Sequence, residues 1–135
     1  MILTINDKTY PLQFGMGAVE RYCDQMDCDV DDIDIHLASP KLINQLKAIN
    51  RLTLCGIENG CDLAKPKIDF DITYGEFQLW LDNQSPKMIS DIISHWKDTS
   101  TLGVKVSEYY NNELLSPEDE PVKKVAKKKS QSEKS

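Results

Sequence analysis

The chain opens with MILTINDKTYPLQFGMGAVERY (residues 1–22), a stretch that predicts a β-hairpin running directly into an amphipathic helix. Residues 2–5 are rich in β-branched side chains, and residues 6–8 supply the turn because Asn and Asp tolerate left-handed backbone angles. Residues 9–14 return with the alternation of a half-buried strand, whose inner face is formed by Tyr10, Leu12 and Phe14. A lone hairpin is marginally stable in water, so this one must pack against the helices that follow.

Two helices are predicted next. Gly15 marks the switch from strand to helix, and the apolar face of the first helix is formed by Met16, Val19, Cys23 and Met26. Ser39-Pro40 predicts the start of a second helix, with Ser as N-cap and Pro at the first helical position. This helix runs from Pro40 to about Asn59, with Gly60 past its end. A broad apolar stripe, widened by Leu54 and Cys55, makes it the predicted central helix: Leu42, Ile43, Leu46, Ile49, Leu52 or Thr53, and Ile57.

Two shorter helices follow a connector in which Ile68, Phe70 and Ile72 alternate with Asp, as in a brief strand or extended arm. Thr73 and Glu76 have the spacing of a capping box, which predicts a helix over residues 74–83. Ser85-Pro86 predicts the next helix, with an inner face formed by Met88 or Ile89, Ile92 or Ile93, and Trp96. We interpret Trp80 and Trp96 as core residues, and the alternative is that they are exposed anchors on a binding face.

Residues 24–34 contain six aspartates, and Asp27, Asp29 and Asp31 match the first three ligand positions of an EF-hand loop. The match then fails, because the positions that need Gly and Glu hold Asp32 and Ala38. The prediction is a solvated loop whose aspartates cap helix N-termini. Within or beside it, a short strand or an anchor to the core is predicted at Ile33, Ile35 and Leu37.

A last helix is predicted over Val104 to Leu115, with Val106, Tyr109 or Tyr110, and Leu114 toward the core. From Ser116 the sequence is almost free of apolar residues, which predicts a disordered, Lys-rich tail. Lys127, Lys128 and Lys129 are interpreted as part of a solubilising tail, or alternatively as an electrostatic arm for an acidic partner. The predicted fold class is therefore α+β: a single domain over residues 1–115, with the hairpin in 1–14 and helices in 15–115, and a tail over 116–135.

Charge and hydropathy argue against a nucleic-acid-binding protein and against a membrane protein. The tail carries six lysines and four acidic residues, so the first 115 residues have a net charge of −8 within a total of −6. An acidic body argues against a nucleic-acid-binding face on the folded part. No apolar run approaches the ~20 residues that cross a bilayer, and the first residues do not have the pattern of a secretory signal. We expect a cytosolic protein without membrane contact.

No catalytic or cofactor-binding motif is present in the sequence. The six glycines form neither a dinucleotide-binding nor a Walker A pattern, and the chain has only two histidines, His36 and His95. The four cysteines have spacings too loose for a typical zinc site and are interpreted as small buried hydrophobes. We therefore expect no enzyme activity, no cofactor and no metal. The alternative is a metal-binding regulator or small metal-dependent enzyme that uses Cys23, Cys28, Cys55, Cys61 and His36.

The opening also carries a resemblance. The run INDKTYPLQFGMGAVERY (residues 5–22) resembles the start of the tail assembly chaperones of long-tailed bacteriophages, which begin with a strand, an Asn-Gly-Lys-type turn, a strand ending in Phe-Gly, and a helix. Asp7 stands where those sequences often have Gly. The resemblance implies a chaperone that binds the tape measure protein, and then the tail tube protein, in the host cytoplasm. It also implies that a longer product arises by ribosomal frameshifting near the Lys-rich end.

The sequence thus leaves two main hypotheses. The first is a tail assembly chaperone that covers an aggregation-prone helical partner through residues outside the core: Tyr109, Tyr110 and Leu114, one side of the 40–59 helix, or the tail lysines Lys127, Lys128 and Lys129. The second is a structural connector that stays in the phage particle. A homo-oligomer is compatible with either hypothesis.

Overall fold

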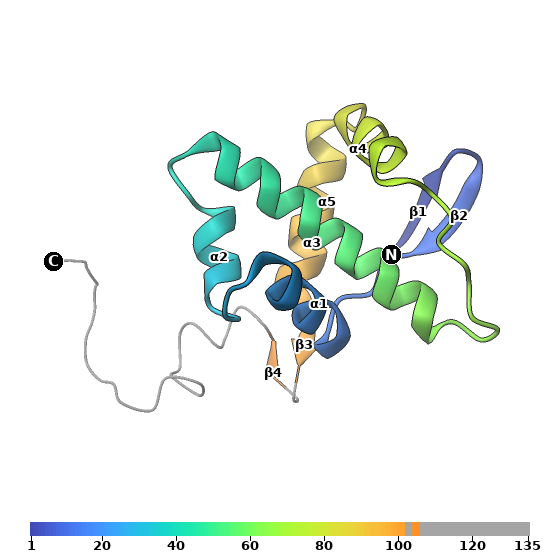
Figure 1. Ribbon diagram of the computed structural model, residues 1–135, viewed down its shortest axis with the longest axis horizontal. Helices are drawn as coiled ribbons and strands as arrows, with labels where there is room; N and C mark the ends of the chain where they lie inside the picture. Colours follow the sequence, from blue (N-terminus) through green and yellow to red (C-terminus); the bar gives the residue numbers. More distant parts are fainter. Residues whose placement is uncertain (102–103, 106–135) are drawn as a thin grey trace, which may run out of the picture.

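The computed structural model describes residues 1–101 and 104–105 of the 135-residue chain. An N-terminal two-stranded hairpin is followed by five helices and a second, very short strand pair, which confirms the α+β class (Figure 1). In chain order, the elements are β1 (Ile2–Ile5), β2 (Lys8–Pro11), α1 (Met16–Met26), α2 (Asp32–Leu37), α3 (Leu42–Leu63), α4 (Tyr74–Asp82), α5 (Pro86–Asp98), β3 (Ser100–Thr101) and β4 (Val104–Lys105).

The hairpin closes through a two-residue turn. Its antiparallel register pairs Ile5 with Lys8, and both turn residues, Asn6 and Asp7, have positive φ angles of 52° and 68°. Positive φ at both central positions is the geometry that matches the twist of paired strands. The predicted inner face is confirmed, although β2 ends before its last two members, and all three side chains are buried: Tyr10, Leu12 and Phe14.

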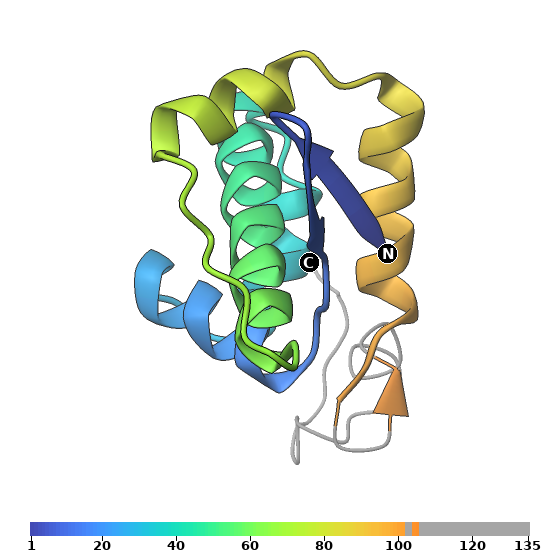
Figure 2. The same cartoon turned by 90° about the vertical axis from the view of Figure 1, so that its right-hand side faces the viewer.

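Helix α3 is the centre of the fold, and the hairpin lies between it and α5 (Figure 2). Its C-terminal half is almost wholly buried, from Leu52 to Cys61. The predicted end at Asn59 is wrong, because the helix continues through Gly60 to Leu63. A Cβ on Gly60 would lie 2.3 Å from the carbonyl oxygen of Pro11, so glycine here permits close packing on the hairpin and does not end the helix.

The predicted start of α3 is also displaced. Ser39 and Pro40 precede the helix, which begins at Leu42 with Lys41 as its N-cap. The Ser39 hydroxyl oxygen accepts a hydrogen bond from the Lys41 backbone N–H over 3.1 Å. Ser39 therefore closes a turn just ahead of α3 instead of capping the helix itself.

Helices α4 and α5 begin as predicted. Thr73 and Glu76 form a reciprocal capping box at α4, and Ser85 accepts a hydrogen bond from Met88 N at the start of α5. Trp96 of α5 is fully buried and packs edge-on against Phe14 with ring centroids 5.5 Å apart. Trp80 of α4 is half-buried and stacks on Phe77, so the core interpretation is confirmed in full for Trp96 alone.

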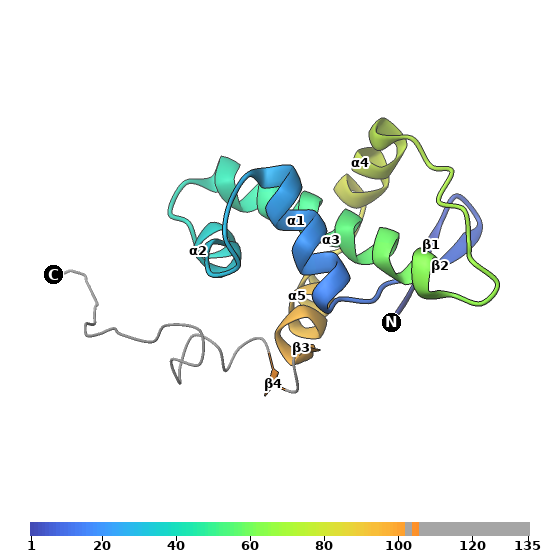
Figure 3. The same ribbon diagram turned by 60° about the horizontal axis from the view of Figure 1, so that its bottom comes forward.

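Helices α1 and α2 cover the other side of α3 (Figure 3). The predicted inner face of α1 is wrong at Met16, which is exposed, because the helix turns Ala18 and Tyr22 into the core. The strand alternative for residues 33–37 is wrong as well, since these residues form α2, whereas the other alternative, an anchor to the core, is confirmed for Ile33 and Leu37. Ile33 is buried and Leu37 partly buried four residues later on the same helical face, while Ile35 points to solvent.

The acidic stretch connects α1 to α2. The backbone N–H of Asp29 donates to the Asp32 carboxylate over 3.0 Å, and Asp32 and Asp34 lie in the first turn of α2. The N-cap residue Asp31 makes no side-chain capping bond, so the predicted capping role fails at that position. The aspartates of this loop instead bond to the turn and face the positive end of a short helix.

The chain beyond α5 departs from the prediction. Ser100–Thr101 pairs antiparallel with Val104–Lys105, so the helix predicted from Val104 does not begin there. The rest of that helix and the predicted tail from Ser116 lie outside the described residues. The fold thus places the fixed core between the hairpin, α3 and α5, and leaves the N-terminal half of α3 extending beyond it (Figure 1).

Candidate partner-binding surface

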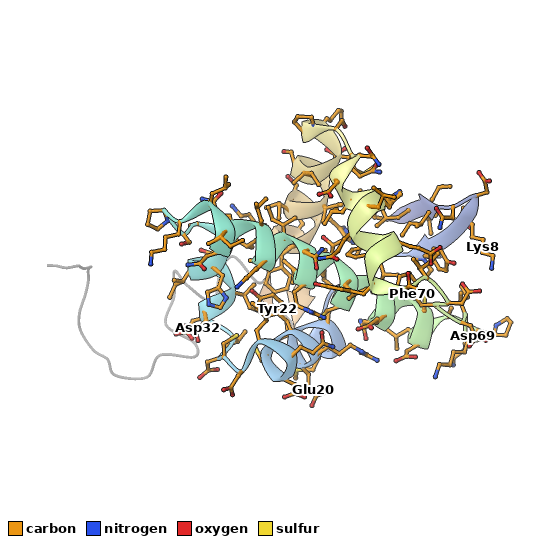
Figure 4. All side chains as sticks on the ribbon, turned by 45° about the horizontal axis from the view of Figure 1, so that its top comes forward. Lys8, Glu20, Tyr22, Asp32, Asp69 and Phe70 are labelled. Atoms are coloured by element: carbon orange, nitrogen blue, oxygen red, sulfur yellow. The ribbon has the colours of Figure 1, made fainter. Side chains whose placement is uncertain are left out.

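An open groove of about 840 Å³ runs between the N-terminal half of α3 and the helices α4 and α5. Figure 4 shows these three helices with their side chains. Apolar residues make up half of its lining, and we call them the apolar floor: Met26, Ile43, Leu46, Ile49, Leu81, Pro86 and Ile89. Polar and charged side chains stand along its walls: Lys47, Asn50, Arg51, Tyr74, Gln78, Asp82 and Gln84.

Three large apolar side chains at the start of α3 are left in solvent. Leu42, Ile43 and Leu46 are 65%, 56% and 53% exposed, and two of them line the groove. The sequence stripe predicted burial for all three, but α3 is longer than the core that covers it. An apolar patch beside a groove is typical of surfaces that bind another protein.

A polar network of residues from α1, α3 and α4 joins the two walls of the groove. Arg51 lies with its Cζ 5.0 Å from the centre of the Tyr74 ring, and its Nη1 donates to Gln25 Oε1 over 2.9 Å. The Tyr74 hydroxyl donates to Asn50 Oδ1 over 2.7 Å. These contacts fix the first turn of α4 against α3, so the groove is preformed in the free chain.

The contact residues predicted in the C-terminal region lie outside the described residues: Tyr109, Tyr110, Leu114, Lys127, Lys128 and Lys129. One side of the predicted 40–59 helix does line the groove, through residues 43–51 of α3. Sequence reasoning missed the opposite wall, from Tyr74 to Ile89, and the available signal was a tyrosine directly after the N-cap Thr73 of α4.

The cysteines are not arranged as a metal site. Cys55 and Cys61 are buried on α3, and Cys23 and Cys28 are half-buried near the end of α1. Burial raises the pKa of Cys28 and of Cys55 to about 12, which keeps both as neutral thiols at physiological pH. Within residues 1–101 and 104–105, no group of three or more His, Cys, Asp or Glu side chains could hold a metal ion.

Both histidines tie segments of the fold together. A hydrogen bond of 3.0 Å joins His36 Nδ1 of α2 to the Tyr22 hydroxyl of α1, and the buried Tyr22 phenol has a pKa raised by desolvation. His95 Nε2 donates to the carbonyl oxygen of Leu12 over 3.3 Å. Each imidazole therefore has a structural contact that accounts for its position.

Among the described residues, no helix combines the length and apolar character needed to cross a membrane. Comparison of the chain with protein-family models, with curated proteins and with solved structures finds no match.

Proposed function

We propose that this chain is a tail assembly chaperone of a long-tailed bacteriophage, which binds the tape measure protein in the host cytoplasm and keeps it soluble until the tail is assembled. The observation that carries the proposal is the groove together with the exposed apolar side chains at the start of α3, Leu42, Ile43 and Leu46. A small domain that keeps such a surface open can cover apolar segments of an aggregation-prone helical protein.

Two further observations support this proposal. The opening residues that resemble the chaperone family form the strand, turn, strand and helix that the resemblance implies, with the switch to α1 at Gly15, whose φ is 130°. The body is acidic, with a net charge of −8 over its first 115 residues, which favours solubility of a complex with an aggregation-prone partner. The tail tube protein is the second partner that the resemblance implies.

The test is co-expression with the tape measure protein of the same phage, which the proposal expects to be a long helical protein encoded downstream. The proposal predicts that the full chain co-purifies with that protein, raises its soluble fraction and is absent from purified phage particles. Failure to bind or to solubilise, together with stoichiometric presence in mature particles, would contradict it and favour the structural connector.

A further inference from the structure

One wall of the groove belongs to a basic segment of the chain that lies between two acidic segments. Residues 35–57 contain no Asp or Glu, but they contain Lys41, Lys47 and Arg51, for a net charge of +3. The segments on either side are acidic, with −6 over residues 1–34 and −4 over residues 58–101. Residues 43–51 of α3, which form one wall of the groove, lie wholly inside the basic segment.

The cations of this wall have no carboxylate partner among the described residues. Four ion pairs occupy cations elsewhere in the described chain: Lys8, Arg21, Lys67 and Lys87. Lys47 is exposed, and Arg51 is bonded to the neutral side chains Gln25 and Tyr74. Lys47 and Arg51 are four residues apart, so they stand on one face of α3. A positive stripe therefore borders an apolar floor in an otherwise acidic body.

The opposite wall has a different character. Besides Tyr74, its polar and charged residues are Gln78, Asp82 and Gln84, which lie on α4 and in the turn that follows. An occupant of the groove is therefore offered positive charge on the α3 side and amide and negative groups on the α4 side. The α3 wall from Ile43 to Arg51 spans about two helical turns, or about 12 Å, which suits the i, i+3, i+4 and i+7 contacts of a helix laid in a groove.

We infer that the groove takes an amphipathic helix whose apolar stripe is flanked by acidic residues on the side that faces α3. This inference rests on the proposed function, since it names the chemistry of the partner segment that the chaperone holds. Apolar burial on the floor supplies the affinity. Charge on the wall supplies orientation and selectivity against segments with basic flanks, because like charges face each other when such a segment docks.

The test uses the full chain and three synthetic 20-residue helical peptides with the same leucine stripe, flanked by Glu, by Gln or by Lys. Affinity is measured by fluorescence anisotropy at low and moderate salt. The expected order is Glu above Gln above Lys, with about a tenfold difference between the extremes, since each exposed charge pair contributes a factor of only a few. Raising the salt should shrink this difference, because exposed charges are screened.

Lys47→Glu reverses a charge on the α3 wall and tests its role in peptide binding, and Lys65→Glu is its matched control. Both lysines are exposed and neither has an ion-pair partner in the part of the chain that the structure describes, but Lys65 lies on the connector away from the groove. Lys47→Glu should abolish or reverse the preference for the Glu peptide, and Lys65→Glu should keep it. Arg51 is left in place because it supports Tyr74.

Equal affinity for the Glu and Lys peptides, no binding of any peptide, or the same loss in both variants would overturn the inference. So would binding to anionic phosphatidylglycerol vesicles without peptide binding, which would assign the basic wall to a membrane surface. So would a dimer that Lys47→Glu dissociates in light scattering, which would assign the groove to a second copy.

The two proposals fail separately. Co-purification of the tape measure protein with no preference among the peptides would overturn the acidic flank and leave the chaperone role. A Glu-peptide preference lost in Lys47→Glu, without co-purification or solubilisation of the tape measure protein, would overturn the chaperone role and leave the acidic flank.

Discussion

The guanidinium of Arg51 lies over the ring of Tyr74, with its Cζ 5.0 Å from the ring centre, and its Nη2 donates to the Tyr74 hydroxyl oxygen over 3.3 Å. The same hydroxyl donates to Asn50 over 2.7 Å. Arg51 and Asn50 belong to α3 and Tyr74 opens α4, so one aromatic residue joins the two walls of the groove.

This relationship predicts different outcomes for two substitutions of Tyr74. Tyr74→Phe removes the hydroxyl but keeps the ring under Arg51, and it should lower the free energy of unfolding by about 0.5–1.5 kcal/mol. Tyr74→Ala also removes the ring and should cost a further ~0.5–1 kcal/mol from the lost cation–π contact, besides the lost packing. Urea denaturation of both variants measures this. An alanine variant as stable as the phenylalanine variant would contradict the role of the ring.

Gly60→Ala tests the close approach between α3 and the hairpin. The added Cβ would meet the Pro11 carbonyl oxygen at 2.3 Å, and backbone on both sides limits relaxation. We expect a loss of about 1–3 kcal/mol in the free energy of unfolding, net of the better helix propensity of Ala. Gly75→Ala is the control, because nothing lies within 4 Å of its added Cβ, and it should be neutral or stabilising. Equal effects at both glycines would refute this packing argument.

The capping box of α4 makes a third prediction. Thr73 Oγ1 accepts from Glu76 N over 3.2 Å, and Glu76 Oε1 accepts from Thr73 N over 2.9 Å. Thr73→Ala should cost about 1 kcal/mol of stability, whereas Thr73→Ser keeps the acceptor and should cost a few tenths. Thermal unfolding of the two variants separates them. If Ser and Ala behave alike, the hydroxyl does not cap the helix.

The contact of the hairpin with the 64–73 connector predicts a pH dependence. Lys8 and Tyr10 donate to the Asp71 carboxylate over 3.1 and 3.2 Å, and the hydrogen bond from Lys8, followed by that from Tyr10, lowers the pKa of Asp71 below 3.8. A carboxyl whose pKa is lower in the folded state stabilises the fold above its unfolded pKa and loses this effect as the pH falls through its folded pKa.

Asp71→Asn should therefore lower the urea midpoint of unfolding at about pH 5–7. This difference from the wild type should vanish as the solution is acidified below the folded-state pKa of Asp71. Asp69→Asn is the matched control, since the Asp69 carboxylate has no ion pair or hydrogen bond within residues 1–101 and 104–105. A shift for Asp71→Asn that persists unchanged in acid would rule out the charged carboxylate as its cause.

Local signals in the sequence predicted the elements that they cap or close. Asn6-Asp7 predicted the hairpin turn because both residues tolerate positive φ angles. Thr73, Glu76 and Ser85 predicted two helix starts because their side chains bond to backbone three residues away. The error at residues 33–37 arose because alternation of Ile with Asp resembles a strand, while the buried face of α2 needs only Ile33 and Leu37.

Long-range packing contacts could not be predicted from the sequence. Gly60 looked like a helix terminus, and only the distance to Pro11 explains why α3 needs glycine there. Leu42, Ile43 and Leu46 belong to the same apolar stripe as buried Leu52, and nothing local separates a side chain in the core from one on a groove. The opposite wall could not be predicted, because it depends on how α4 and α5 fold back over α3.

The central claim is that the α3 side of the groove holds the partner, and Leu46 and Leu63 provide a matched pair to test it. Both lie on α3 and are 53% and 54% exposed, but Leu46 lines the groove and Leu63 lies at the far end of the helix. Aspartate at either exposed site should change stability by only about 0.5 kcal/mol. The measurement is co-purification of the tape measure protein with the wild type, Leu46→Asp and Leu63→Asp. The account predicts loss of the partner in Leu46→Asp alone, and retention of the partner by Leu46→Asp would contradict it.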